Sequence, residues 1–79
     1  MPMTPDSRYG EWVEFRETRI AKGYSLSAFA RASVISKGYL GDLEKGHKLP
    51  SPVMLAKIAV ALNVPLGVIE RRIDTWVAS

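Results

Sequence analysis

Basic side chains gather in the middle of this sequence. Residues 31–57 carry five cations and two carboxylates, and five minus two leaves a surplus of +3, which equals the net charge of the whole chain. Charges cancel on either side of this stretch. Such a local excess attracts a polyanion such as nucleic acid, although a solvated surface with uneven charge gives the same pattern. The cations are Arg31, Lys37, Lys45, Lys48 and Lys57, and the carboxylates are Asp42 and Glu44.

Residues suited to catalysis or metal binding are scarce by contrast. His47 is the one histidine, and cysteine is absent, which excludes thiolate metal sites and disulfides. The sequence has no carboxylates paired at a useful spacing and no glycine-rich phosphate loop. We therefore predict that the chain is not an enzyme and that it has no metal, cofactor or small-molecule ligand.

Two short helices joined by a tight turn must position most of these cations. The first is predicted over 26–32 and the second over 37–45, with Ser25 and Ser36 as their N-caps. A turn as short as 33–35 makes this unit a helix-turn-helix, which places its second helix in the major groove of DNA. The residues expected to face inward are Leu26 or Phe29, together with Ala30, Ile35, Leu40 and Leu43.

Further helices are predicted on both sides of this unit. One runs from about residue 7 or 8 to Lys22 and ends at Gly23. Another begins at the Ser51 cap, has Pro52 at its first position, and ends at Asn63. The inward-facing residues are Trp12, Phe15, Arg19 and Lys22 in the first, and Val53, Leu55, Ile58, Ala59 and Leu62 in the second.

The two ends of the chain complete the expected organisation. Residues 1–7 hold two prolines and no periodicity, which predicts a flexible N-terminal arm. A last helix over about 65–77 carries Leu66, Ile69, Ile73 and Trp76 at helical spacing. This apolar face either packs back onto the first helix or forms a dimer interface, and tryptophan is typical of interface centres. We expect one all-α domain over 8–79.

Length and composition fit a small cytoplasmic protein. With 79 residues, we expect a single domain and no separate effector domain. The longest apolar run, 58–62, is far shorter than the roughly 20 residues that cross a membrane. The first residues lack the basic and apolar regions of a signal peptide. We therefore expect a soluble protein without membrane contact.

A series of features follows one another between Gly23 and Pro50. They are a polar N-cap at Ser25, the pair Phe29-Ala30, the turn 33–35, a second cap at Ser36, the leucines Leu40 and Leu43, the sequence Glu44-Lys45-Gly46, and Pro50. In this combination they resemble the helix-turn-helix domain of phage Cro and repressor proteins and their bacterial XRE-type relatives. A looser match covers about 12–70. The resemblance implies a compact five-helix, lambda-repressor-like DNA-binding domain, with the helix-turn-helix at helices 2 and 3.

The resemblance also implies roles for individual residues. Phosphate or sugar contacts fall to Ser25, Ser27, Ser36, Tyr39, Lys45, His47 and Lys48, and base-facing positions to Lys37, Gly38 and Asp42. A carboxylate in the groove is repelled by phosphate but can accept from cytosine N4. Asp42 therefore either reads a base, lies outside the contact surface, or holds Lys37 or Lys45 in place. Gly38 and Gly41 weaken a helix, so they mark either a close approach of DNA or positions where a small residue is merely tolerated.

Arg19 needs a partner if it faces inward, because an unpaired buried charge is costly. The resemblance implies that it pairs with Glu44 and so fixes the first helix against the end of the recognition helix. Two residues depart from the family pattern. Leu26 replaces a glutamine that contacts phosphate, and Val34 stands where glycine is common. A β-branched residue disfavours left-handed backbone, so we expect this turn to differ in detail.

These observations predict a sequence-specific, double-stranded DNA-binding transcription regulator. The nearest model is a small Cro-like repressor that binds a palindromic operator as a homodimer, with recognition helices about 34 Å apart. The proposed dimer residues are Leu66, Ile69, Ile73 and Trp76. Two alternatives remain open: an antitoxin or controller-type regulator of the same fold, and a protein–protein module that uses the C-terminal helix.

Overall fold

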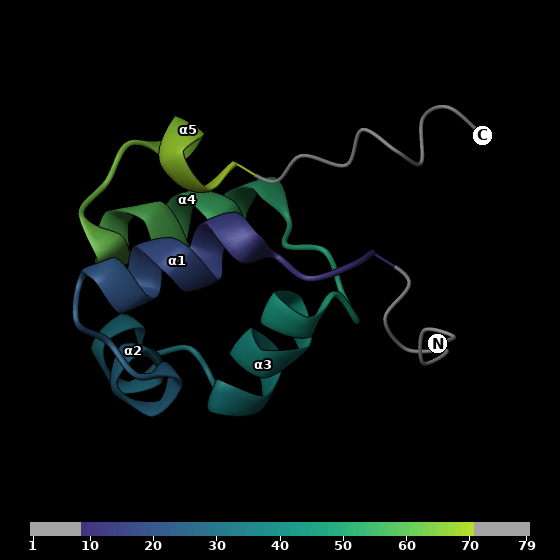
Figure 1. Cartoon of the computed structure of the whole chain (residues 1–79), viewed down its shortest axis with the longest axis horizontal. Helices are drawn as coiled ribbons and strands as arrows, with labels where there is room; N and C mark the ends of the chain where they lie inside the picture. The colour runs from purple at the N-terminus through teal and green to yellow at the C-terminus, as the bar shows by residue number, and fades with distance from the viewer. Residues whose placement is uncertain (1–8, 71–79) are drawn as a thin grey trace.

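Five helices account for the regular structure of the computed structural model, which describes residues 9–70; no strand occurs in this range. Figure 1 shows α1 across the middle of the molecule, with α2 and α3 on one side of it and α5 on the other. α3 and α5 both pack on α1, and α4 packs on α2 and α5. The bounds are α1 Val13–Ala21, α2 Leu26–Ser33, α3 Lys37–Lys45, α4 Pro52–Leu62 and α5 Leu66–Ile69. The prediction of an all-α, five-helix fold is confirmed.

Serine caps begin three of these helices, as the sequence predicted. The hydroxyls of Ser25, Ser36 and Ser51 each accept a hydrogen bond, 3.0–3.1 Å long, from the backbone N–H three residues later. Each cap satisfies a donor that has no partner within the helix. Asn63 ends α4 in the left-handed conformation. None of the helices in the described range is long and apolar enough to cross a membrane.

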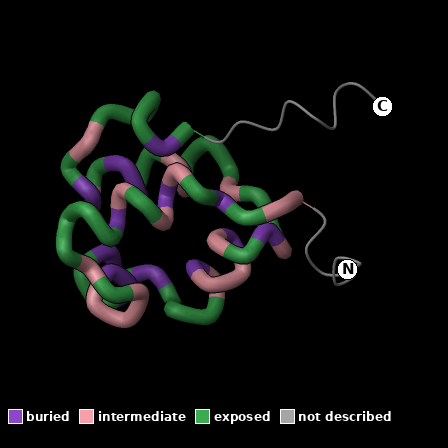
Figure 2. The backbone as a smooth tube through the Cα atoms, viewed as in Figure 1, coloured by how far each residue is buried: buried purple, intermediate pink, exposed green. Residues whose placement is uncertain are grey.

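The core lies where the helices face one another (Figure 2). Trp12, Phe15, Phe29 and Tyr24 form a chain of ring contacts, with neighbouring ring centroids 4.9–5.5 Å apart, which joins α1 to α2. Burial of large side chains supplies most of the stability of such a domain. The largest fully buried side chains are Trp12, Phe15, Phe29, Leu40, Leu43, Ile58, Leu62 and Ile69.

Two residues that the sequence placed inside lie outside. Val53 is 80% exposed, because α4 turns Ile58 and Leu62 inward and a position five residues before Ile58 lies toward the opposite side. Lys22 is exposed as well, after the end of α1.

The first helix begins at Val13, several residues later than predicted. Gly10 has a φ of +74°, which a helix does not accommodate, and the chain before α1 instead runs beside the end of α3. The N–H of Tyr9 donates to the carbonyl of Gly46 (3.0 Å), and that of Trp12 to the carbonyl of Glu44 (2.9 Å). These bonds satisfy carbonyls at the C-terminal end of α3, which have no partner within the helix.

The last described helix is short. α5 ends at Ile69, and Glu70 has a ψ of 126°, where the sequence predicted helix to about residue 77. The buried indole N–H of Trp12 donates to the carbonyl of Ile69 at 2.9 Å, so this carbonyl is satisfied without a further helical turn. The arm over 1–7 and the positions Ile73 and Trp76 lie outside the described residues.

Candidate nucleic-acid interface

The turn between α2 and α3 sets the angle at which α3 is presented. Val34 adopts the left-handed conformation (φ 58°, ψ 37°), so the turn keeps the geometry that a glycine would give, and the expectation of a different turn was wrong. The side chain of Val34 is 85% exposed, and it therefore avoids steric conflict with the core. The following residue, Ile35, is buried and anchors the turn.

The N-terminal half of α3 presents an open face. Lys37 and Gly38 are exposed, whereas Leu40 and Leu43 of the same helix are fully buried. A Cβ atom added at Gly38 would meet nothing within 4 Å. Within residues 9–70, Lys37 forms no ion pair. A cation at the positive end of a helix opposes the helix dipole, so Lys37 does not stabilise α3 through this interaction.

The N-termini of α2 and α3 lack the acidic residues that usually stabilise such ends. Neither helix has an acid in its first turn, and the same is true of α4 and α5, whereas α1 has Glu14. The hydroxyls of Ser25 and Ser36 are engaged by their cap hydrogen bonds, and Ser27 is half-buried. No carboxylate in the first turn therefore offsets the partial positive charge at these two helix ends.

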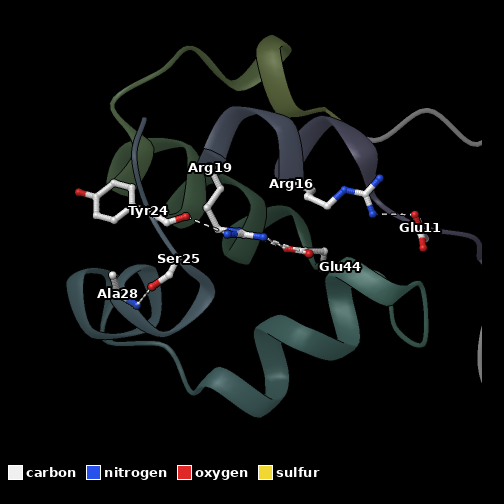
Figure 3. Close-up of polar contacts among 7 residues, drawn as sticks. All are labelled: Glu11, Arg16, Arg19, Tyr24, Ser25, Ala28 and Glu44. Atoms are coloured by element: carbon white, nitrogen blue, oxygen red, sulfur yellow. Dashed lines mark hydrogen bonds and ion pairs between the residues drawn. The ribbon is translucent and has the colours of Figure 1, made fainter. Parts of the chain in front are cut away.

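Arg19 and Glu44 join α1 to the C-terminal end of α3 (Figure 3). Nε and Nη2 of Arg19 donate to the Glu44 carboxylate at 2.9–3.2 Å, and Nη1 donates to the carbonyl of Tyr24 at 2.8 Å. Their side chains are only 9% and 16% exposed. Because the pair is desolvated and bidentate, it fixes the position of α3 more firmly than a surface ion pair does. The same figure shows the surface pair of Arg16 and Glu11, whose atoms are 2.7 Å apart.

Asp42 sits in a second cluster, the turn cluster, which comprises Tyr39, Asp42, His47 and Lys48. The carboxylate lies 3.3 Å from Nδ1 of His47 and 3.5 Å from Nζ of Lys48, and that Nζ lies 5.6 Å from the centre of the Tyr39 ring. Of the roles left open by the sequence, holding a neighbouring cation is observed, but the cation is Lys48 and not Lys37 or Lys45. The described part of the chain contains no group of three or more residues that would hold a metal ion.

The predicted dimer residues fall into three situations. Leu66 is 43% exposed at the start of α5, whereas Ile69 is fully buried within the single chain. Ile73 and Trp76 lie outside the described residues. Because α5 packs against α1, Ile69 follows the alternative in which this face packs back onto the first helix.

Leu26 and Gly41, two unusual residues of this unit, lie next to each other. A Cβ atom at Gly41 would lie 3.8 Å from Cδ2 of Leu26, an ordinary contact. Leu26 therefore packs across the α2–α3 interface. Sequence reasoning missed the support that Tyr9, Gly10 and Trp12 give to α3, because this support comes from backbone groups that no residue type signals.

A family model described as helix-turn-helix matches residues 15–69, which include α2 and α3 whole. The chain belongs to this helix-turn-helix family. Family membership confirms the resemblance to XRE-type proteins that the sequence showed. The family is one of transcription regulators and not of enzymes.

Three family relatives show how far the similarity extends. The transcriptional regulator ClgR of Mycobacterium tuberculosis is 37% identical over 54 residues, 68% of this chain and 48% of ClgR. The regulator SutR of Escherichia coli is 42% identical over 52 residues, 66% of this chain and 29% of SutR. The ImmF control region 10 kDa protein of Bacillus phage phi105 is 34% identical over 55 residues, 70% of this chain and 61% of the phage protein. The chain thus spans about half of ClgR and less than a third of SutR. No solved structure matches it significantly.

Proposed function

We propose that this chain is a sequence-specific, double-stranded DNA-binding transcription regulator that lays α3 in the major groove. The exposed N-terminal half of α3 carries the proposal. Lys37 is exposed there and Gly38 has open space around it, while buried leucines anchor the helix. A lysine in this position donates to guanine O6 and N7, and a glycine allows a close approach of the backbone.

Charge supports this assignment. Both carboxylates of residues 31–57 are engaged, Asp42 with His47 and Lys48, and Glu44 with Arg19. The cations of this stretch other than Lys48 form no ion pair in the described structure, so their charge acts on whatever approaches. They are Arg31, Lys37, Lys45 and Lys57. Lys45 and Lys48 lie beside the C-terminal end of α3, where they would contact phosphate.

The regulator acts, in this proposal, as a homodimer on a palindromic operator, in the manner of a small Cro-like repressor. Two recognition helices related by two-fold symmetry would lie about 34 Å apart, one turn of DNA. Exposed Leu66 and the sequence positions Ile73 and Trp76 are the proposed contacts between subunits. An antitoxin or a controller-type regulator would use the same DNA contacts, and it would differ in what it regulates.

Selection of bound sequences from a random double-stranded library, at near-physiological salt, tests the proposal. We expect a recovered motif with two-fold symmetry and a spacing of about 10 base pairs between half-site centres. A single asymmetric half-site would keep the DNA function and remove the dimer. If no sequence is enriched, the proposed function is wrong.

Exposed apolar residues favour a second candidate, a protein-binding module. Val53 and Val60 on α4 are 80% and 79% exposed, and Leu66 and Val68 on α5 are also exposed. An apolar surface of this kind often contacts another protein. Retention on DNA that falls steeply with salt favours the regulator, because each phosphate contact releases counterions. If the chain is not retained on DNA at any salt concentration, the protein-binding module is favoured.

A further inference from the structure

The chain reverses direction after α3 around a single residue, Asp42. Its backbone carbonyl accepts hydrogen bonds from the N–H of His47 (2.8 Å) and of Lys48 (3.4 Å). Its carboxylate contacts the side chains of the same two residues, at 3.3 Å and 3.5 Å. Gly46, at a φ of +87°, allows the turn between them. Asp42 therefore fixes both the backbone and the side chains of the residues that follow α3.

The carboxylate of Asp42 is engaged within the protein. Oδ1 lies 3.3 Å from Nδ1 of His47 and Oδ2 lies 3.5 Å from Nζ of Lys48, so each oxygen has a nitrogen neighbour within the protein. Each carboxylate oxygen can accept more than one hydrogen bond, so a cytosine amino group would have to share the carboxylate with His47 and Lys48. Because the two contacts hold the carboxylate at the turn and offset its charge, they favour a positioning role for Asp42 over base reading.

Lys48 is directed by this cluster. Its Nζ lies between the Asp42 carboxylate and the face of the Tyr39 ring, 5.6 Å from the ring centre. More than half of the Lys48 side chain remains exposed, so the ammonium is oriented but not buried. A lysine on an exposed turn otherwise samples many rotamers, and restricting them lowers the entropy lost when it contacts phosphate.

We propose that Asp42 is a positioning residue, which holds Lys48 and His47 ready for the DNA backbone and does not itself read a base. The inference rests on the proposed DNA-binding function, and it assigns base reading and phosphate binding to different ends of α3. Lys37 and Gly38 at the N-terminal end face the bases, and the turn cluster at the other end binds phosphate.

A binding profile separates the two roles of Asp42. The operator selected by the parent chain and all its single-base-pair variants are titrated with the full-length chain, with Asp42→Asn, with Lys48→Met, and with the double variant. Asp42→Asn keeps the size of the side chain and removes its charge. Glu17→Gln, on the exposed surface of α1, controls for the loss of one carboxylate alone. The ring signals of His47, the one histidine, report the contact with Asp42 without DNA.

Positioning predicts that Asp42→Asn changes affinity for all sequences by one common factor, with every base preference kept within about twofold. It also predicts coupling between the two residues. The factor by which Asp42→Asn changes affinity should differ by threefold or more between the Lys48→Met background and the parent chain, because the residue that Asp42 holds is absent in the former. The His47 signals should shift in Asp42→Asn and stay unchanged in Glu17→Gln.

Two results would overturn the inference while leaving the DNA function intact. One is that Asp42→Asn loses the preference at a single base pair, and that the same loss occurs in the Lys48→Met background. This result would mean that Asp42 reads a base. The other is unchanged binding to every sequence, which places Asp42 outside the contact surface. If the parent chain binds no DNA, the proposed function itself fails, and the inference fails with it.

Discussion

At its N-terminal end, α3 exposes Lys37, which forms no ion pair within residues 9–70, and Gly38, whose Cβ position has open space around it. At its C-terminal end, the side chain of Glu44 is held by Arg19 and its carbonyl by the N–H of Trp12. This difference explains how one short helix can be held in place and still expose residues to a ligand. Contacts that fix its position are concentrated at one end, so the other end is left free to meet a ligand.

The packed end is most sensitive at Gly46. A Cβ atom there would overlap the backbone of Gly10, and the φ of +87° is unfavourable for any other residue. We expect Gly46→Ala to cost about 4 kcal/mol or more, a large share of the stability of a small domain. Urea unfolding followed by circular dichroism measures this change.

Gly23→Ala is the matched control, because Gly23 has a similar φ of +85° but open space around its Cβ position. It should cost about 1–2 kcal/mol, the backbone strain alone. Equal losses in the two variants would show that the contact between Gly10 and Gly46 contributes nothing.

The ion pair at the same end gives the next largest effect. Glu44→Ala leaves the Arg19 guanidinium nearly buried without its carboxylate, and we expect a loss of about 3 kcal/mol. The double variant Arg19→Met with Glu44→Leu should lose much less stability than the sum of Arg19→Met alone and Glu44→Leu alone, because no charge is left unpaired. Additive losses in a double-mutant cycle would contradict the pairing.

The exposed end should respond in the opposite direction. Gly38→Ala removes a glycine from the first turn of α3 without a steric conflict, so the free energy of unfolding should rise by up to about 1 kcal/mol. If DNA approaches the backbone here, the same change should weaken operator binding about tenfold or more.

Gly41→Ala controls for the change in helix propensity. Its Cβ atom would touch only Leu26, so stability should rise by a similar amount and operator binding should stay within about twofold. Equal operator affinity in the Gly38 and Gly41 variants would remove Gly38 from the contact surface.

The smallest effect is expected at the turn that precedes the exposed end. Val34 is left-handed and its side chain is mostly exposed, so Val34→Gly relieves strain and sacrifices little packing. The larger conformational freedom of glycine in the unfolded chain offsets part of this gain. We expect a net rise of about 0.5–1 kcal/mol in urea unfolding, and a loss would mean that the valine side chain is stabilising.

Local rules carried the prediction of the fold far. Serine caps, the left-handed Gly23 and Asn63, and the buried Leu40 and Leu43 all follow from residue type and spacing, and each is found in the structure. Val34 departed from its propensity because the caps and the buried Ile35 on either side determine the turn.

Contacts between residues far apart in the chain could not be predicted from the sequence. The late start of α1 depends on backbone hydrogen bonds from Tyr9 and Trp12 to the end of α3, and neither residue type specifies such a partner. The bonding of Asp42 to Lys48 depends in the same way on a chain reversal after Gly46. Candidate DNA-contacting residues could be named from the family pattern. The difference between the open and the packed end of α3 could be recognised only in the three-dimensional structure.

The most direct test of this division compares Lys37→Ala with Lys48→Ala on the selected operator and on its single-base-pair variants. If the open end reads bases, Lys37→Ala should abolish the preference at one base pair, a loss of about 1–3 kcal/mol in discrimination, and bind the other variants in their original order. Lys48→Ala should weaken all sequences alike and reduce the salt dependence by about one phosphate contact. A uniform loss in Lys37→Ala as well would contradict the separation of reading and positioning along α3.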